Sequence, residues 1–203
     1  MEKLFSTVLL CCFCFVAFAA NSATALQKEF TSLRTMSADF TQVTLSSKGE
    51  ALQKQSGKMA VQRPGDFYWH ILKPREELIV VSNDSAWVYD KDLAQVTHRK
   101  VDYKNPVNPA FLLSGDLSKV QDAFDVTSHR VGKFDAWYVL VPKDKRAVFS
   151  KLQLRFVHDA IKEMYITDKL GQHSMIDFYN IKINEKLSDS LFHFKIPKGV
   201  DVL

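Results

Sequence analysis

From Ser37 onward, apolar and polar residues alternate with a period of two, and this alternation constrains the fold more than any other feature of the chain. Short turn pairs such as Asn83-Asp84 and His158-Asp159 separate the alternating segments, which is typical of antiparallel hairpins. The predicted strands are 38–47, 51–62, 66–72, 77–82, 85–90, 93–99, 123–131, 135–142, 148–157, 160–168 and 172–183. The sequence therefore predicts a mainly β fold, with about eleven antiparallel strands in one large curled sheet or barrel.

The first 25 residues have the features of a secretion signal. Lys3 precedes an apolar run, Leu4 to Ala20, and both Ala17-Phe18-Ala19 and Ala23-Thr24-Ala25 have the small-x-small pattern that signal peptidase reads. We therefore predict that 1–25 is a cleaved signal peptide, cut after Ala19, Ala23 or Ala25, and that 26–203 forms a single domain. A membrane anchor is the alternative, but the apolar run is short for a span.

All three cysteines, Cys11, Cys12 and Cys14, lie in this signal, so the mature chain must fold without disulfides. Attachment of a lipid to Cys11 would need a small residue before it, and Leu10 is bulky. We therefore expect that the mature protein is not itself lipidated.

Two segments depart from the strand pattern. Leu26, Phe30 and Leu33 are spaced i, i+4, i+7 and predict an amphipathic N-terminal helix. Between the two groups of strands, Asn108-Pro109 resembles a helix start and Gly115 a helix stop, which predicts a short helix over 110–114. Its consecutive apolar residues cannot all be buried on one face of so short a helix, so we interpret this segment as a lid over the concave side of the sheet.

The stretch "SGKMAVQRPGDFYWHILKP" (56–74) concentrates aromatic side chains and one arginine in a single hairpin. Because side chains alternate along a strand, one face is expected to carry Arg63, Phe67, Trp69 and Ile71. The opposite face then carries Tyr68, His70 and Leu72. Either this is an ordinary core strand, or one of its two apolar faces lines a ligand cavity.

The sequence contains no recognisable catalytic motif. Its six histidines are dispersed, no glycine-rich phosphate loop is present, and no G-x-S-x-G elbow follows a strand. The net charge of +4 is mild, and its lysines are interleaved with aspartates rather than gathered in a basic stripe. We therefore expect a binding protein without enzymatic activity, cofactor, metal ion or nucleic-acid partner.

Five segments, in order, resemble the periplasmic outer-membrane lipoprotein carrier proteins of Gram-negative bacteria. They are "SADFTQ" (37–42), "SGKMAVQRPGDFYWHILKP" (56–74), "AWVYDKDLAQVT" (86–97), "NPAFLLSGD" (108–116) and "FHFKIPKGVDVL" (192–203). Small departures are Lys91, where the family often has proline, and the end of the chain at Leu203, where some relatives continue.

The resemblance implies an incomplete eleven-stranded barrel, closed over by short helices, whose apolar cavity holds the acyl chains of lipoproteins. It implies that Arg63 latches a lid, formed by Pro109, Ala110, Phe111, Leu112 and Leu113, through hydrogen bonds to backbone carbonyls. The residues expected to line the cavity are Phe40, Phe67, Trp69, Ile71, Trp87, Tyr89, Leu154 and Phe156.

The resemblance further implies that the chain works in the periplasm and passes acylated lipoproteins from an inner-membrane ABC-type releasing complex to an outer-membrane receptor lipoprotein. We also expect the protein to be a monomer. Two other functions stay open at this point. One is the receptor itself, which shares the fold but carries its own lipid, and the other is a general periplasmic binder of apolar ligands.

Overall fold

The computed structural model describes residues 14–101, 112–115 and 120–203. One α-helix, α1 (Cys14–Ser32), precedes the first six strands, and a short helix, α2 (Val120–Ala123), precedes the others. The first six strands are β1 (Thr35–Leu45), β2 (Ala51–Gln62), β3 (Asp66–Lys73), β4 (Glu77–Ser82), β5 (Ser85–Asp90) and β6 (Gln95–Lys100). The next five are β7 (Phe124–Gly132), β8 (Asp135–Pro142), β9 (Phe149–Val157), β10 (Ala160–Asp168) and β11 (His173–Ile183).

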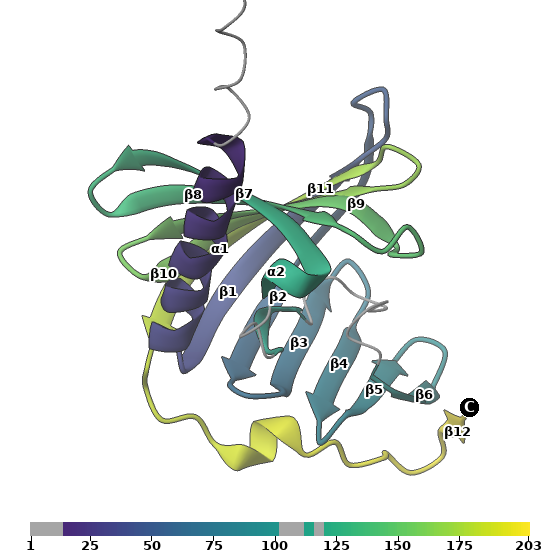
Figure 1. Cartoon of the computed structure of the whole chain (residues 1–203). Coiled ribbons are helices and arrows are strands. Elements are labelled where there is room, and N and C mark those ends of the chain that lie inside the picture. The colour runs from purple at the N-terminus through teal and green to yellow at the C-terminus, as the bar shows by residue number, and fades with distance from the viewer. Residues whose placement is uncertain (1–13, 102–111, 116–119) are drawn as a thin grey trace, which may run out of the picture.

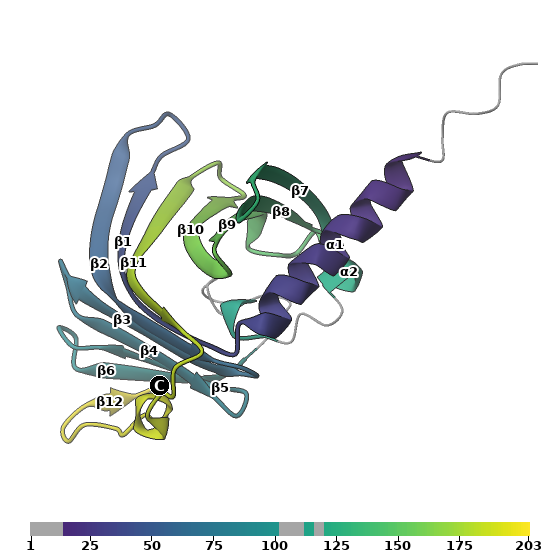
Figure 2. The same ribbon diagram turned by 90° about the vertical axis from the view of Figure 1, so that its left-hand side faces the viewer.

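These strands form one strongly curved sheet that does not close into a barrel. Its strand order is β12-β6-β5-β4-β3-β2-β1-β11-β10-β9-β8-β7, so β7 lies at one edge and the short strand β12 (Asp201–Val202) at the other. Figures 1 and 2 show the sheet curling around a central space, with α1 crossing its open side. The predicted half-open, mainly β fold is confirmed.

The alternation of burial along the strands explains why the sheet curls around an apolar interior. In β3, for example, Phe67, Trp69 and Ile71 are buried, whereas Tyr68 and His70 are only half-buried. Cross-strand partners share a face, so each inward residue meets another inward residue on the next strand. Trp69, for instance, is opposite Met59 in β2 and Ile79 in β4. One continuous apolar core therefore lies on the concave face.

Helix α1 covers part of this concave face. The three residues that predicted it, Leu26, Phe30 and Leu33, are all buried in the core. Phe30 contacts the edge of Phe156, with ring centroids 5.4 Å apart. The helix begins earlier than the sequence pattern indicated, because it continues through the segment that we interpreted as part of a signal. Within the described residues, no helix combines the length and the apolarity that crossing a bilayer requires.

The C-terminal segment is the main feature that the sequence analysis missed. After β11, a 3-10 turn, η2 (Asp189–Phe192), packs on β3 and β4, and β12 then pairs with β6 in parallel. This segment runs along the convex side of the sheet, in yellow in Figures 1 and 2. Strand β12 has only two residues, too few for an alternating pattern to reveal it.

Turn positions follow the predicted chemistry. Asn83-Asp84 and His158-Asp159 have the same pair of positive φ values, 49° and 62°, which suits the tight turns of two-residue hairpins. Asn and Asp tolerate this left-handed conformation better than other non-glycine residues. The strand boundaries on either side of these turns agree with the prediction, because the turns leave little freedom in where a hairpin reverses.

Gly57 allows β2 and β3 to approach closely, which provides a test of the fold. A Cβ atom at this position would overlap the backbone carbonyl oxygen of His70, so the strands would have to separate. We expect Gly57→Ala to lower the free energy of unfolding by about 3 kcal/mol, measured by urea denaturation. Gly132→Ala is the matched control, because no heavy atom lies within 4 Å of its Cβ position. Equal stability of the two variants would contradict this account of the β2–β3 contact.

Candidate functional site

An aromatic cluster lies at the centre of the concave face. The rings of Phe40 and Trp69 are stacked with centroids 3.9 Å apart and an interplanar angle of 23°. Phe67 stacks beside Trp69 at 5.9 Å, and Phe178 contacts it edge-on at 6.3 Å. These four side chains come from β1, β3 and β11, and all are fully buried. The curvature of the sheet thus brings together rings that are far apart in the sequence.

Six of the eight residues expected to line a cavity lie on this concave face. Phe40, Phe67, Trp69 and Ile71 belong to the first half of the sheet, and Leu154 and Phe156 belong to β9 in the second half. In the conformation described here, all six are packed in the core. Their role in holding acyl chains therefore stays a prediction.

Trp87 and Tyr89 lie on the opposite, convex face, so their assignment to the cavity lining is corrected. Trp87 is opposite Val80 in β4 and stacks on His98 of β6, with centroids 4.0 Å apart. Phe194 of the C-terminal segment covers both rings, at 5.6 Å from Trp87 and 6.2 Å from Tyr89. A strand that is apolar on both faces gives no signal of which face points inward.

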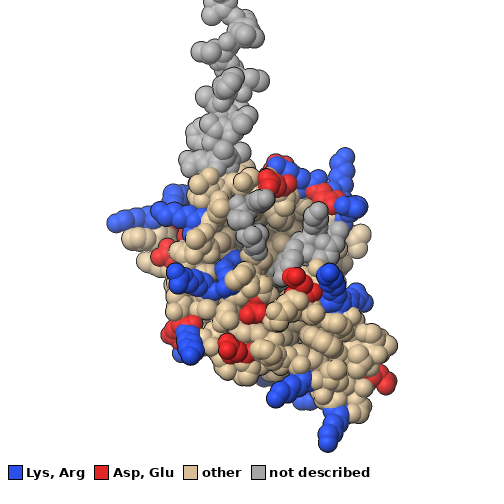
Figure 3. All heavy atoms as spheres, turned by 60° about the horizontal axis from the view of Figure 1, so that its bottom comes forward, with Lys and Arg blue, Asp and Glu red and all other residues tan. Residues whose placement is uncertain are grey.

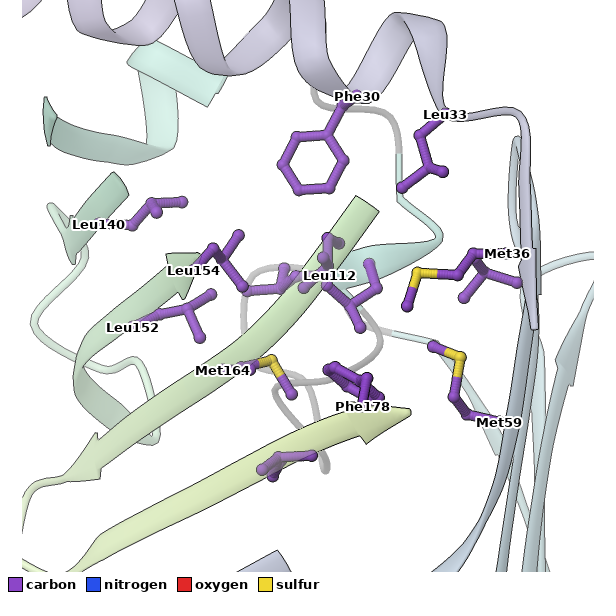
Figure 4. Close-up of a cluster of buried hydrophobic side chains, with 14 of the residues drawn as sticks. Phe30, Leu33, Met36, Met59, Leu112, Leu140, Leu152, Leu154, Met164 and Phe178 are labelled. Atoms are coloured by element: carbon purple, nitrogen blue, oxygen red, sulfur yellow. The ribbon is translucent and has the colours of Figure 1, made fainter. Parts of the chain in front are cut away.

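Three methionines complete the concave face, and sequence reasoning did not single them out. Met36 from β1, Met59 from β2 and Met164 from β10 are buried around the same space as Leu154 and Phe178 (Figure 4). The position of Met36 could have been found from the i, i+2 series Met36, Ala38, Phe40. Methionine is flexible and polarizable, so it suits a surface that must accept groups of different shape.

The described part of the expected lid lies inside this space. Leu112 and Leu113 are buried in the core, and Leu112 points among the methionines and leucines of the sheet (Figure 4). Pro109, Ala110 and Phe111 lie outside the described residues. We call residues 112–115 the cover segment. Its leucines occupy the interior that a ligand would need.

Arg63 connects the sheet to the cover segment. Its Nη1 donates a hydrogen bond to the carbonyl oxygen of Gly115 at 3.0 Å, and the amide of Gly65 donates to the carbonyl of Ser114 at 2.9 Å. The guanidinium also lies over the ring of Phe30, 4.3 Å from its centroid. The hairpin turn at 63–65 thus holds both the cover segment and helix α1.

The guanidinium of Arg63 is only partly satisfied in this position. Its Nε and Nη2 are buried and have no hydrogen-bond partner within the described structure. Burial lowers the pKa of Arg63 to about 10, because removal from water disfavours the charged form. Arg63 therefore makes a charge-assisted hydrogen bond to Gly115 while the rest of its guanidinium is poorly solvated.

A pocket of about 800 Å³ opens beside the cover segment. It lies between the turns at 63–66 and 83–84 on one side and α2, β7 and the β8–β9 loop on the other. Its apolar walls include Leu112, Val120, Phe124, Ala147 and Phe149. The volume falls within the range of about 300–1,000 Å³ that is typical of ligand pockets. Its lining contains no member of the aromatic cluster described above, so it adjoins the concave face rather than filling it.

Charges on the surface around this region are mixed. Figure 3 shows one face of the molecule, on which Lys and Arg side chains are scattered among Asp and Glu rather than gathered in one patch. Within the described part of the chain, no three His, Cys, Asp or Glu side chains come together as metal ligands. The features that stand out in the described site are therefore its apolar surface and the latch.

The fold is shared with solved structures of low sequence identity. A putative outer membrane lipoprotein-sorting protein domain from Vibrio parahaemolyticus superposes with a TM-score of 0.51 at 11% identity, covering 86% of this chain and 97% of that one. A LolA superfamily protein from Nitrosomonas europaea gives a TM-score of 0.50 at 11% identity, covering 85% of this chain and 98% of the other.

Sequence comparison gives a much closer relationship. An outer-membrane lipoprotein carrier protein from Azotobacter vinelandii is 38% identical over 208 residues, covering 99% of both chains. One from Pseudomonas fluorescens is 42% identical over 170 residues, covering 84% of this chain and 82% of the relative. The family profile "Outer membrane lipoprotein carrier protein LolA" matches residues 31–195. The chain therefore belongs to the outer-membrane lipoprotein carrier protein family.

Proposed function

We propose that this protein is a periplasmic carrier that shields the acyl chains of lipoproteins between the inner and the outer membrane. Membership of the carrier family supports this role. The observation that carries the proposal is the cover segment, whose Leu112 and Leu113 occupy the centre of an aromatic and methionine-lined concave face. Apolar side chains that belong to a separate segment can be exchanged for acyl chains without unfolding the sheet.

A carrier must bind acyl chains without holding them permanently. At about 0.8 kcal/mol per buried CH₂, full burial of one 16-carbon chain would contribute about 12 kcal/mol. Two or three such chains would exceed the practical limit of about 20 kcal/mol for noncovalent affinity. The carrier must therefore bury them incompletely, or lose favourable contacts of its own when it binds them.

The closed cover segment provides such opposing contacts. When acyl chains enter, Leu112 and Leu113 leave the core and the bond from Arg63 to Gly115 breaks. A charge-assisted hydrogen bond contributes about 1.5–3 kcal/mol to the closed state. These losses lower the affinity for lipid, so the cargo can pass to a stronger binder without an energy source at that step.

The pocket beside the cover segment is the proposed entrance for the first acyl chain. Leu112 belongs both to the pocket wall and to the core, so a chain inserted there would contact the residue that it must displace. Opening could then spread from Leu112 to Leu113 and the aromatic cluster. The proposed acyl-contacting residues are Phe40, Phe67, Trp69, Ile71, Leu154 and Phe156, with Met36, Met59 and Met164 added.

The proposal includes the partners and the location that the family resemblance implies. The chain would be secreted through a cleaved signal within 1–25 and act as a monomer without a lipid of its own. It would accept lipoproteins from an inner-membrane ABC-type releasing complex and deliver them to an outer-membrane receptor lipoprotein.

Mass spectrometry of the lipid that copurifies with the protein distinguishes this function from general binding of apolar ligands. We expect an acylated lipoprotein, whereas free fatty acid would identify a general binder.

Loss of the latch should loosen the cover segment. In Arg63→Leu, the carbonyl of Gly115 loses its donor, so we expect faster amide hydrogen exchange at Leu113 to Gly115. Arg130→Leu is the control, because its exposed guanidinium donates a hydrogen bond to the carbonyl oxygen of Lys133 within its own hairpin. Unchanged exchange in the cover segment of Arg63→Leu would contradict the latch.

Inner-membrane vesicles should release lipoproteins when the protein is added and retain them without it.

The variant Arg63→Leu should also change the transfer of cargo. We expect Arg63→Leu to accept cargo but to release it to the receptor about tenfold more slowly, because the closed state no longer competes with lipid as strongly. Purified carrier and receptor provide the assay, with Arg130→Leu as the control. Equal release rates for wild type and Arg63→Leu would refute the opposing role of the latch.

The two faces of the sheet can be distinguished by tryptophan fluorescence. A variant that keeps only Trp69 (Trp87→Phe and Trp137→Phe) should lose most of its emission when it binds a lipopeptide with brominated acyl chains. A variant that keeps only Trp87 (Trp69→Phe and Trp137→Phe) should keep its emission, because this ring lies on the convex face. Quenching of Trp87 but not Trp69 would place the acyl chains on the wrong face for this proposal.

A further inference from the structure

The first turns of α1 bear on where the secretion signal ends. Three bonds are candidates for cleavage, after Ala19, Ala23 and Ala25, and sequence patterns left the choice open. All three lie within α1, which runs without interruption over Cys14–Ser32. Because the domain packs against this helix, the structure can distinguish residues that belong to the fold from residues that can be removed.

Residues 22 and 23 belong to the folded domain. Ala23 is 4% exposed and is part of the hydrophobic core. Ser22 is buried as well, and its Oγ lies 2.9 Å from Oγ of Ser128 in β7. Strand β7 is an edge of the sheet, so this contact ties helix α1 to an edge that is otherwise paired only with β8 in the described sheet.

Cleavage after Ala25 would be costly for the fold. The mature chain would begin at Leu26, whose side chain and backbone are 0% exposed. The new α-ammonium group would then be attached directly to a core residue, and the helical turn that precedes Leu26 would be lost. The same cut would remove Ala23 from the core and leave Ser128 without Ser22.

Cleavage after Ala23 would also remove buried residues, although the new N-terminus would not be a core residue. The chain would begin at exposed Thr24, but Ser22 and Ala23 would both be lost. The residue three positions from the end of that signal would be Asn21, which departs from the small-x-small pattern. By contrast, Ala17 and Ala19 supply both small residues, and a cut after Ala19 keeps Ser22, Ala23 and the buried residues that follow them in α1.

We infer that signal peptidase hydrolyses the peptide bond between Ala19 and Ala20. Water adds across this bond, so Ala19 ends the released signal as a carboxylate and Ala20 begins the mature chain as an amine. The inference rests on the proposed secretion of this chain and assigns six residues, Ala20 to Ala25, to the mature protein rather than to the signal. Of these, Ser22 and Ala23 act as the anchor of α1 on β7.

N-terminal sequencing and intact-mass measurement of the protein secreted by a Gram-negative host test the inference. We expect a single mature form that begins Ala20-Asn21-Ser22. A mature form that begins at Thr24 or Leu26 would overturn the inference but leave secretion standing. A protein that keeps Met1 would overturn both, whereas the carrier role is judged separately in the transfer assay.

Two matched variants of the full chain provide a second readout. Ala19→Leu removes the small residue next to the proposed bond, so uncleaved precursor should accumulate several-fold over wild type. Ala25→Leu places the same substitution at the competing site and should leave the ratio of precursor to mature protein unchanged. The reverse pattern, with precursor accumulating in Ala25→Leu alone, would show that the later bond is the one cleaved.

Discussion

The fold depends on an apolar concave face that the sheet cannot close over by itself. The sheet curves but ends at β7 on one side and β12 on the other, so no strand pairing seals the interior. Burial of apolar surface stabilises the fold by about 25 cal/mol per Å², which makes an uncovered interior of this kind costly. Other segments must therefore cover it, and α1 and the cover segment do so.

The two coverings differ in how firmly they are held. Helix α1 is continuous, buries the large side chains of Leu26 and Phe30, and is tied to β8 by the hydrogen bond that Tyr138 donates to Glu29 at 3.2 Å. The cover segment is short, and within the described residues it accepts hydrogen bonds from Arg63 and Gly65 in the turn at 63–65. Arg63 serves both, since its guanidinium contacts Phe30 of α1 and Gly115 of the cover segment. Under the proposed function, α1 would be the fixed wall of the interior and the cover segment the part that acyl chains displace.

The convex face shows that an apolar strand pattern does not by itself identify a surface that contacts a ligand. Trp87 and Tyr89 are aromatic residues of the kind expected in a cavity lining, yet both pack against Phe194 of the C-terminal segment. Shifting a strand by one residue exchanges its faces, so the inward face was predictable only where one side is polar. Along β9 the alternation is clean, and Leu154 and Phe156 lie in the core on the concave face. In β5 both faces are apolar, and the assignment failed.

The sequence alone determined the local structure, because period-two alternation and turn chemistry act over a few residues. It predicted the strands, the hairpins at Asn83-Asp84 and His158-Asp159, and the buried stripe of α1. Tertiary structure decided what depends on contacts between distant segments. These include the inward face of β5, the methionines around the interior, the pairing of β12 with β6, and the bond between Arg63 and Gly115. No local pattern encodes such contacts, since each one exists only after the sheet has curved and brought its partners together.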